Sequence, residues 1–218
     1  MKKVFLLLNL LFLVTVLAIA QEPTSTQNSH LQKLIDGNNR FINGKSIHPD
    51  ESMLRVQEIQ SEQHPFAIVV SCSDSRVTPE IIFDQGLGDI FSIRTAGNVI
   101  GDLELGSIEY AVEHLHCKLI IVLGHENCGA IKAFIEDDGK KHNDHISKIL
   151  EYIKEEKEEQ AILAKDKSSV PLAVEANILH CVNLLKHSKP ILEESIEHNH
   201  VKVFGALYEL STGKVSFK

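Results

Sequence analysis

The sequence predicts an α/β domain with a central, mostly parallel β-sheet flanked by helices. Residues 66–70 and 119–123 form two short runs in which every residue is apolar, and such runs are typical of strands that are buried on both faces. Segments whose apolar residues recur at helical spacing alternate with these runs. This order is expected of parallel strands that are joined by right-handed helical crossovers.

The first predicted helix spans residues 30–43, between Ser29 as a capping residue and Gly44. Along the chain we then expect a strand at 66–70, a strand at 90–93, a glycine-containing loop at 97–101, a helix at 102–116, a strand at 119–123, an amphipathic helix within 144–167, a helix at 172–186 and a last strand at 201–210. Polar motifs follow directly on two of these strands. Open α/β sheets bind ligands at that end of their strands.

The first 20 residues have the order of an export signal. Lys2 and Lys3 precede an apolar run over residues 4–20, and the run ends in Ala18-Ile19-Ala20, where small residues suit a signal peptidase. An uncleaved membrane anchor is the alternative, which the small residues disfavour. We therefore expect residues 1–20 to be a cleaved signal peptide, and the mature protein to be exported, periplasmic or secreted, and not held in the membrane.

Composition limits the partners and the number of domains. The 218 residues include 22 basic and 30 acidic side chains, a net charge of −8 at pH 7. Nucleic acid is not an expected partner, because its phosphates attract basic surfaces. Residues 21–28 form a polar leader without a core pattern, and no repeat or linker divides the rest. We expect a single domain over residues 29–218.

Two of the four cysteines have no polar motif around them. In an exported protein, four cysteines would by default form two disulfides. Cys117 and Cys181 lie in apolar surroundings and are expected to be small buried hydrophobic residues. A bridge between these two is the alternative, and the sequence does not decide between them.

The other two cysteines belong to motifs with metal-binding chemistry. The first motif is Cys72-Ser73-Asp74-Ser75-Arg76, and the second is His125-Glu126-Asn127-Cys128-Gly129. Thiolate and imidazole are preferred zinc ligands, and three protein ligands with a fourth position open are typical of catalytic zinc. Cys72, His125 and Cys128 are therefore predicted to bind Zn²⁺.

Asp74 and Arg76 complete the first motif. Asp74 is a further candidate ligand, which would either close the metal site or hydrogen-bond to a molecule in the open position. Arg76 is placed to pair with Asp74 in a bidentate, charge-assisted contact. Each motif alone could be a turn or a chance match, but their joint position at two strand ends favours a metal site.

These motifs resemble those of the β-class carbonic anhydrases over nearly the whole chain after the signal. The resemblance includes Leu-Ile-Asp-Gly-Asn-Asn-Arg-Phe-Ile-Asn-Gly at 34–44, Ser-Cys-Ser-Asp-Ser-Arg-Val at 71–77, Arg-Thr-Ala-Gly-Asn at 94–98 and Gly-His-Glu-Asn-Cys-Gly-Ala at 124–130. It implies a β-carbonic-anhydrase-like fold and reversible hydration of carbon dioxide to bicarbonate and a proton by zinc-bound hydroxide. Asp74 and Arg76 would be the catalytic dyad that gates and orients the fourth ligand.

The same resemblance implies a substrate pocket at an interface between subunits, and hence a homodimer or homotetramer. By motif spacing, the pocket residues would be Gln63, Phe91, Ala96, Tyr110 and the backbone N–H of Gly129. Some bacterial relatives bind regulatory bicarbonate through a tryptophan shortly before the first cysteine. This chain has Val69 at that position and no tryptophan, so that regulation is not expected.

Three alternative functions remain from the sequence. The same fold and zinc site could hydrolyse carbon disulfide or carbonyl sulfide. The protein could bind zinc or bicarbonate without turnover, which the intact Asp74 and Arg76 disfavour. Finally, Cys72 and Cys128 could form a disulfide in an oxidising compartment, which would make this a thiol protein.

Overall fold

The computed structural model describes residues 26–137, 144–155 and 169–218. The predicted signal at 1–20, the first part of the predicted leader at 21–25 and the part of the predicted charged helix at 156–167 lie outside the described residues. No helix within the described ranges is long and apolar enough to cross a membrane.

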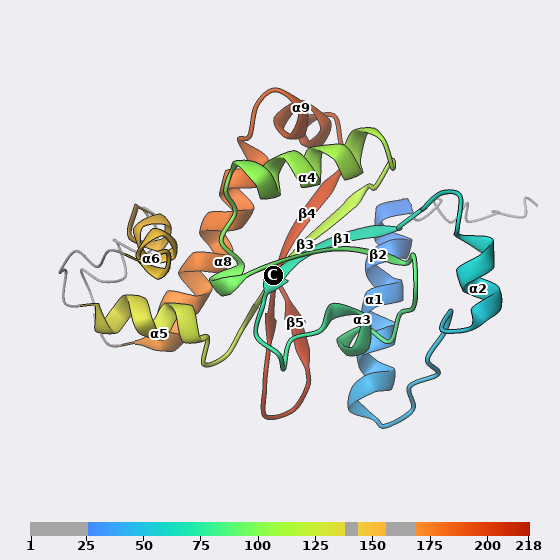
Figure 1. Cartoon of the computed structure of the whole chain (residues 1–218), viewed down its shortest axis with the longest axis horizontal. Helices are drawn as coiled ribbons and strands as arrows, with labels where there is room; N and C mark the ends of the chain where they lie inside the picture. The colour runs from blue at the N-terminus through green and yellow to red at the C-terminus, as the bar shows by residue number, and fades with distance from the viewer. Residues whose placement is uncertain (1–25, 138–143, 156–168) are drawn as a thin grey trace, which may run out of the picture.

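A five-stranded sheet forms the centre of the molecule, with strand order β2-β1-β3-β4-β5 (Figure 1). Its strands are β1 (Ala67–Cys72), β2 (Ile90–Thr95), β3 (Leu119–His125), β4 (Lys202–Tyr208) and β5 (Val215–Phe217). The first four run parallel to one another, and β5 is antiparallel to β4. The predicted α/β class and mostly parallel sheet are confirmed. Strand β5 was not predicted, because three residues are too few to show a strand period.

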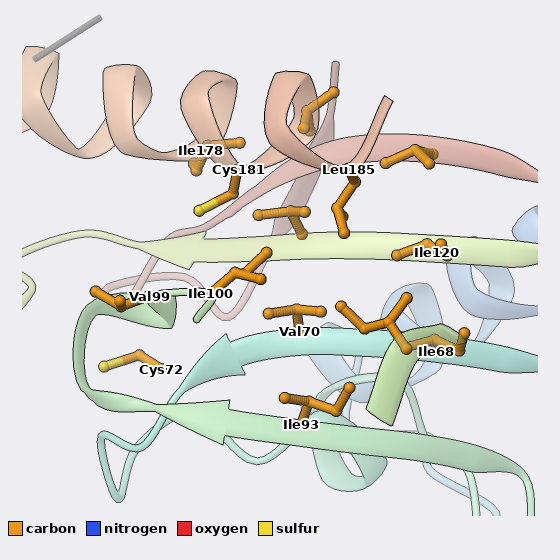
Figure 2. Packing of buried hydrophobic residues seen from close by; sticks show 14 of the residues in the cluster. Ile68, Val70, Cys72, Ile93, Val99, Ile100, Ile120, Ile178, Cys181 and Leu185 are labelled. Atoms are coloured by element: carbon orange, nitrogen blue, oxygen red, sulfur yellow. The ribbon is translucent and has the colours of Figure 1, made fainter. Parts of the chain in front are cut away.

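Alternate residues of the central strands point to opposite faces of the sheet, and each face is covered. Ile68, Val70 and Ile120 belong to one core, which they share with α4, α5 and α8, and Figure 2 shows these side chains between the strands and α8. Val69 and Ile121 belong to the second core, with residues of α1 and α3. Burial on both faces explains why the two strands read as unbroken apolar runs.

The helices confirm most of the predicted segments and add short ones. They are α1 (Thr26–Ile42), α2 (Met53–Glu58), α3 (Pro79–Ile82), α4 (Asp102–Glu113), α5 (Gly129–Glu136), α6 (Ile146–Glu155), α8 (Val170–Lys186) and α9 (Ile191–Glu197), together with the short 3-10 helix η1 (Ala96–Asn98). The short elements α2, α3, α5, α9 and η1 were not predicted. These elements span at most about two turns, too little for a helical repeat of apolar residues to appear.

One predicted boundary needs correction. Helix α1 begins at Thr26, three residues before the predicted start of the domain at Ser29. Gln27 is buried, and its amide nitrogen donates to the backbone carbonyl oxygens of Asn199 and His200 at 2.9 and 3.2 Å. The polar composition of residues 21–28 suggested a leader, but these long-range hydrogen bonds attach its last residues to the domain.

Candidate metal centre

The two polar motifs meet at one edge of the sheet. Strands β1 and β3 pair in parallel, with Ser71 opposite Leu123, so Cys72 and His125 stand at neighbouring strand ends. Cys128 follows as the residue before α5. The ligand atoms of these three residues lie within 4.8 Å of one another, and all three side chains are buried. Among the described residues, this is the one group of three or more His, Cys, Asp or Glu side chains that could hold a metal ion.

The ring of His125 is oriented by a single hydrogen bond. Its Nδ1 lies 2.8 Å from the carbonyl oxygen of Glu126. Because a carbonyl oxygen only accepts, Nδ1 carries the hydrogen, and Nε2 has a free lone pair. Nε2 is buried and has no hydrogen-bond partner within the described part of the chain. An unpartnered acceptor of this kind is what a metal ligand requires.

The two thiols share the charge of the centre before a metal binds. The pKa of Cys72 is lowered, chiefly because the Cys128 thiol donates to its sulfur, and the N–H groups of Asp74 and Gly97 lower it further. The pKa of Cys128 is raised by its neighbour Cys72 and by burial. A divalent cation can replace the shared proton, since thiolates are the binding form.

Asp74 and Arg76 form the predicted pair on the solvent side of the cluster. The Arg76 Nε donates to Asp74 Oδ1 at 2.9 Å, and its Nη2 donates to Oδ2 at 2.7 Å. This guanidinium, more than any other group, holds the pKa of Asp74 well below its ordinary value. Oδ2 also lies 4.0 Å from His125 Nε2, so the carboxylate faces the cluster while it remains bound to Arg76.

A residue without an assigned role in the sequence analysis holds the first motif in place. Arg94 at the end of β2 donates from Nε to the Cys72 carbonyl oxygen at 3.2 Å and from Nη2 to the Asp74 carbonyl oxygen at 2.8 Å. These bonds tie the loop between Cys72 and Arg76 to the neighbouring strand. A charged residue at a strand end was visible in the sequence, but its carbonyl partners were not.

The donor set fits zinc. Two cysteine sulfurs and one imidazole nitrogen are zinc ligands of the usual type, and three of them leave one tetrahedral position for an exchangeable molecule. An ion bound here would give the buried Nε2 of His125 a partner and would replace the proton that the two thiols share. Asp74 is engaged by Arg76 and stands beside the three ligands as the dyad arrangement requires.

The predicted pocket residues divide into two groups within one chain. Ala96 belongs to η1, beside the Cys72 loop, and Gly129 begins α5 next to Cys128. Phe91 pairs with Ile68, four residues before Cys72, which is about 13 Å along the strand. Its ring lies 6.5 Å from that of Tyr110. Gln63 is exposed and precedes β1, so it lies beyond the other end of that strand from the metal centre.

None of the four cysteines is in a disulfide. Cys117 Sγ donates to the carbonyl oxygen of Pro65 at 3.0 Å, and burial raises the pKa of this thiol to about 12. Cys181 instead contacts Asn98. The open alternative of a Cys117–Cys181 bridge is therefore not realised, and both residues are buried as expected.

The fold and site define a class of protein, an α/β domain with a zinc centre of two thiolates and one imidazole at the carboxyl edge of a parallel sheet. Comparison with known proteins agrees. Residues 67–215 match the family model described as carbonic anhydrase. A carbonic anhydrase of Mycolicibacterium smegmatis is 36% identical over 201 residues, covering 90% of this chain and 95% of that protein.

Solved structures give the same result. The β-carbonic anhydrase CcaA superposes with a TM-score of 0.68 and 29% identity, covering 86% of this chain and 94% of that one. The Coccomyxa β-carbonic anhydrase, solved with acetazolamide, superposes with a TM-score of 0.67 and 27% identity, covering 85% of each chain. The chain belongs to the carbonic anhydrase family, and to its β class.

Replacing one sulfur ligand tests the metal centre. We predict that Cys128→Ser weakens zinc binding by more than the roughly 10–100-fold that changes outside the ligand set cause, because an uncharged hydroxyl replaces a thiolate. Zinc content after dialysis and competition with a chelator measure this loss. Cys117→Ser is the matched control, since Cys117 contacts a carbonyl oxygen and not the cluster, and it should bind zinc like the wild type. Equal zinc affinity in both variants would contradict the assigned ligands.

Proposed function

We propose that this protein catalyses the reversible hydration of carbon dioxide to bicarbonate and a proton, with zinc held by Cys72, His125 and Cys128. The observation that carries the proposal is the ionised Asp74 beside an open set of three zinc ligands. A metal site that served only to stabilise the fold would be expected to have four protein ligands. Relatives of this chain in two mycobacterial species are named carbonic anhydrases.

Zinc, when bound, lowers the pKa of water from 15.7 to about 7 and so supplies a nucleophile at neutral pH. The protein's own residues orient the reaction. Asp74 is ionised and therefore accepts hydrogen bonds only. Its Oδ2 accepts one bond from Arg76 and faces the cluster, which leaves a lone pair for the O–H of the attacking molecule. That bond directs the nucleophile's own lone pair toward the carbon of the substrate.

The pH range of this arrangement follows from the lowered pKa of Asp74. A carboxyl with a depressed pKa stays ionised at all pH values above its ordinary range, and it loses its charge only when the pH falls further, through the depressed value. Asp74 therefore remains an acceptor throughout the neutral range. No observation on the described residues favours hydrolysis of carbon disulfide or carbonyl sulfide.

Stopped-flow hydration of carbon dioxide tests this function. The zinc-loaded protein should turn over, and Asp74→Asn should lower kcat/KM by about 10–100-fold, because an amide can donate to the nucleophile and no longer pairs with Arg76 by charge. Asp36→Asn makes the same chemical change on the exposed face of α1 and should leave the rate unchanged. A zinc-loaded wild type without turnover would contradict the proposal.

We further propose that the protein is a homodimer or homotetramer whose subunits complete each other's pockets. Gln63, Phe91 and Tyr110 lie away from the metal centre of their own chain, so a second copy would have to supply them. Helix α2 buries none of its residues, and Met53 and Leu54 are about 70% exposed. Strand β2 is an edge of the sheet. Another protein of this fold, from Sordaria macrospora, is described as tetrameric.

Light scattering of the eluted protein tests the assembly. The wild type should elute as two or four copies, and Leu54→Glu should shift it toward the monomer, because a charge would be buried between subunits. Leu179→Glu places the same charge on the exposed side of α8 and should leave the mass unchanged. A monomeric wild type with full turnover would rule out a shared pocket.

We also propose that residues 1–20 are a cleaved export signal and that the protein acts outside the cytoplasm, in the periplasm or as a secreted enzyme. The charged start, apolar run and small residues at 18–20 support this. Mass spectrometry of the N-terminus of protein from the extracytoplasmic fraction should find Gln21 first. Ala20→Lys should retain the signal on the chain. Cytoplasmic protein that starts at Met1 would contradict export.

A further inference from the structure

The loop that follows β2 hydrogen-bonds to one of the predicted zinc ligands, Cys72. The N–H of Gly97 donates to the Cys72 sulfur at 3.3 Å in a buried position, and the N–H of Asp74 donates to the same sulfur at 3.4 Å. Hydrogen bonds to a ligand sulfur orient it and reduce its electron donation to the metal. The position of Gly97 therefore affects how Cys72 binds zinc, although Gly97 is not a ligand.

This loop has a backbone conformation that needs external support. Gly97 has a φ of 70° and Asn98 a φ of 48°, so two consecutive residues are left-handed. Asn tolerates this region only at some cost, and glycine is free to leave it. Without fixed contacts, Gly97 could rotate and withdraw its N–H from the sulfur.

Helix α8 supplies these contacts from about 80 positions further along the chain. Asn177 is 2% exposed, and its Nδ2 donates to the Gly97 carbonyl oxygen at 2.7 Å. One turn later, the Cys181 sulfur accepts from Asn98 Nδ2 at 3.6 Å and donates to the Asn98 carbonyl oxygen at 3.5 Å. Figure 2 shows Cys181 on the side of α8 that faces Val99 and Cys72. Gly97 is thus held on both sides of its Cα, by Asn177 and by the ligand sulfur.

The close approach of α8 to the sheet explains how Asn177 reaches the loop. A Cβ atom at Gly124 would lie 2.5 Å from the Ile178 side chain, and one at Gly205 would lie 2.7 Å from it. Two glycines on adjacent strands therefore make room for the helix next to Asn177. Asn177 is a polar side chain on the buried face of α8, among apolar residues such as Val174 and Ile178.

We infer that Asn177 is a positioning residue of the zinc site. By fixing the Gly97 carbonyl, it keeps the Gly97 N–H on the Cys72 sulfur and so sets the geometry of that ligand and its charge donation to zinc. This inference rests on the metal centre of the proposed function, but not on turnover. The simpler role, in which Asn177 only satisfies a buried carbonyl, predicts a change in stability without a change in the metal site.

Two variants remove the amide donor and differ in how they fill its place. Asn177→Leu keeps the branched shape of the side chain with somewhat bulkier methyl groups, and Asn177→Ala leaves space. Both should weaken zinc binding by about 10–100-fold, the usual effect of losing a partner of a metal ligand, as measured by competition with a chelator. Leu185→Ala is the matched control, because Leu185 is fully buried two turns further along α8 and lies further from Val99 than Cys181 does (Figure 2). It should lower Tm while leaving the zinc affinity of the folded protein unchanged.

A measurement on the metal itself separates positioning from general stability. In the wild type loaded with ¹¹³Cd, NMR should detect scalar coupling between the metal and the Gly97 amide proton through the N–H···S bond. The coupling should persist in Leu185→Ala and disappear in both Asn177 variants. The wild-type coupling is a test that does not depend on whether any variant folds, and its absence would overturn the inference.

Zinc affinity within twofold of the wild type in a folded Asn177 variant would also overturn it. The outcomes for the two proposals are distinct. A wild type that binds zinc and shows the coupling, but does not hydrate carbon dioxide, refutes the proposed activity alone. A wild type that turns over, with Asn177 variants whose metal site is unchanged, refutes the positioning role alone.

Discussion

The parallel pairing of β1 with β3 is the constraint on which the rest of the site depends. Their register places Ser71 opposite Leu123, so the two loops that carry the ligands leave the sheet side by side. A shift of one residue would displace a loop by about 3.3 Å and turn its side chains to the other face of the sheet. The packing of α8 opposes such a shift of β3, because it would put a larger residue where Gly124 lies, and even a Cβ atom there would lie 2.5 Å from the Ile178 side chain.

Burial then divides the site into two chemical regions. His125 is fully buried, and Cys72 and Cys128 are no more than 5% exposed, so a cation bound by the two sulfurs and by the unpartnered Nε2 of His125 would be shielded from water. Asp74 and Arg76 lie toward solvent, where a charged pair is maintained by two direct hydrogen bonds and not by exclusion of water. The metal ligands are held rigidly by the core, whereas the dyad remains accessible to a small substrate. Arg94 joins the regions by binding the carbonyl oxygens of Cys72 and Asp74.

The sequence was sufficient to predict what depends on local pattern. The runs at 66–70 and 119–123 correspond to β1 and β3 because both strands are buried on both faces, and the ligand set follows from residue types at their ends. Contacts that depend on distant parts of the chain could not be predicted. Asn177 is one of two asparagines on α8, and nothing in the sequence separates it from Asn183. Only the packing of α8 against Gly124 and the hydrogen bond to Gly97 show that it reaches the loop. The surroundings of the pocket residues Gln63, Phe91 and Tyr110 could not be predicted either, since a single chain does not bring these residues to the metal centre.

The central claim is that strand pairing assembles a zinc site of two thiolates and one imidazole with one open position. X-ray absorption spectroscopy of the zinc-loaded protein at neutral pH tests this most directly. We expect two sulfur ligands at about 2.3 Å and two nitrogen or oxygen ligands at about 2.0–2.2 Å, one from His125 and one from an exchangeable molecule. A shell of four sulfurs, or one without sulfur, would contradict it.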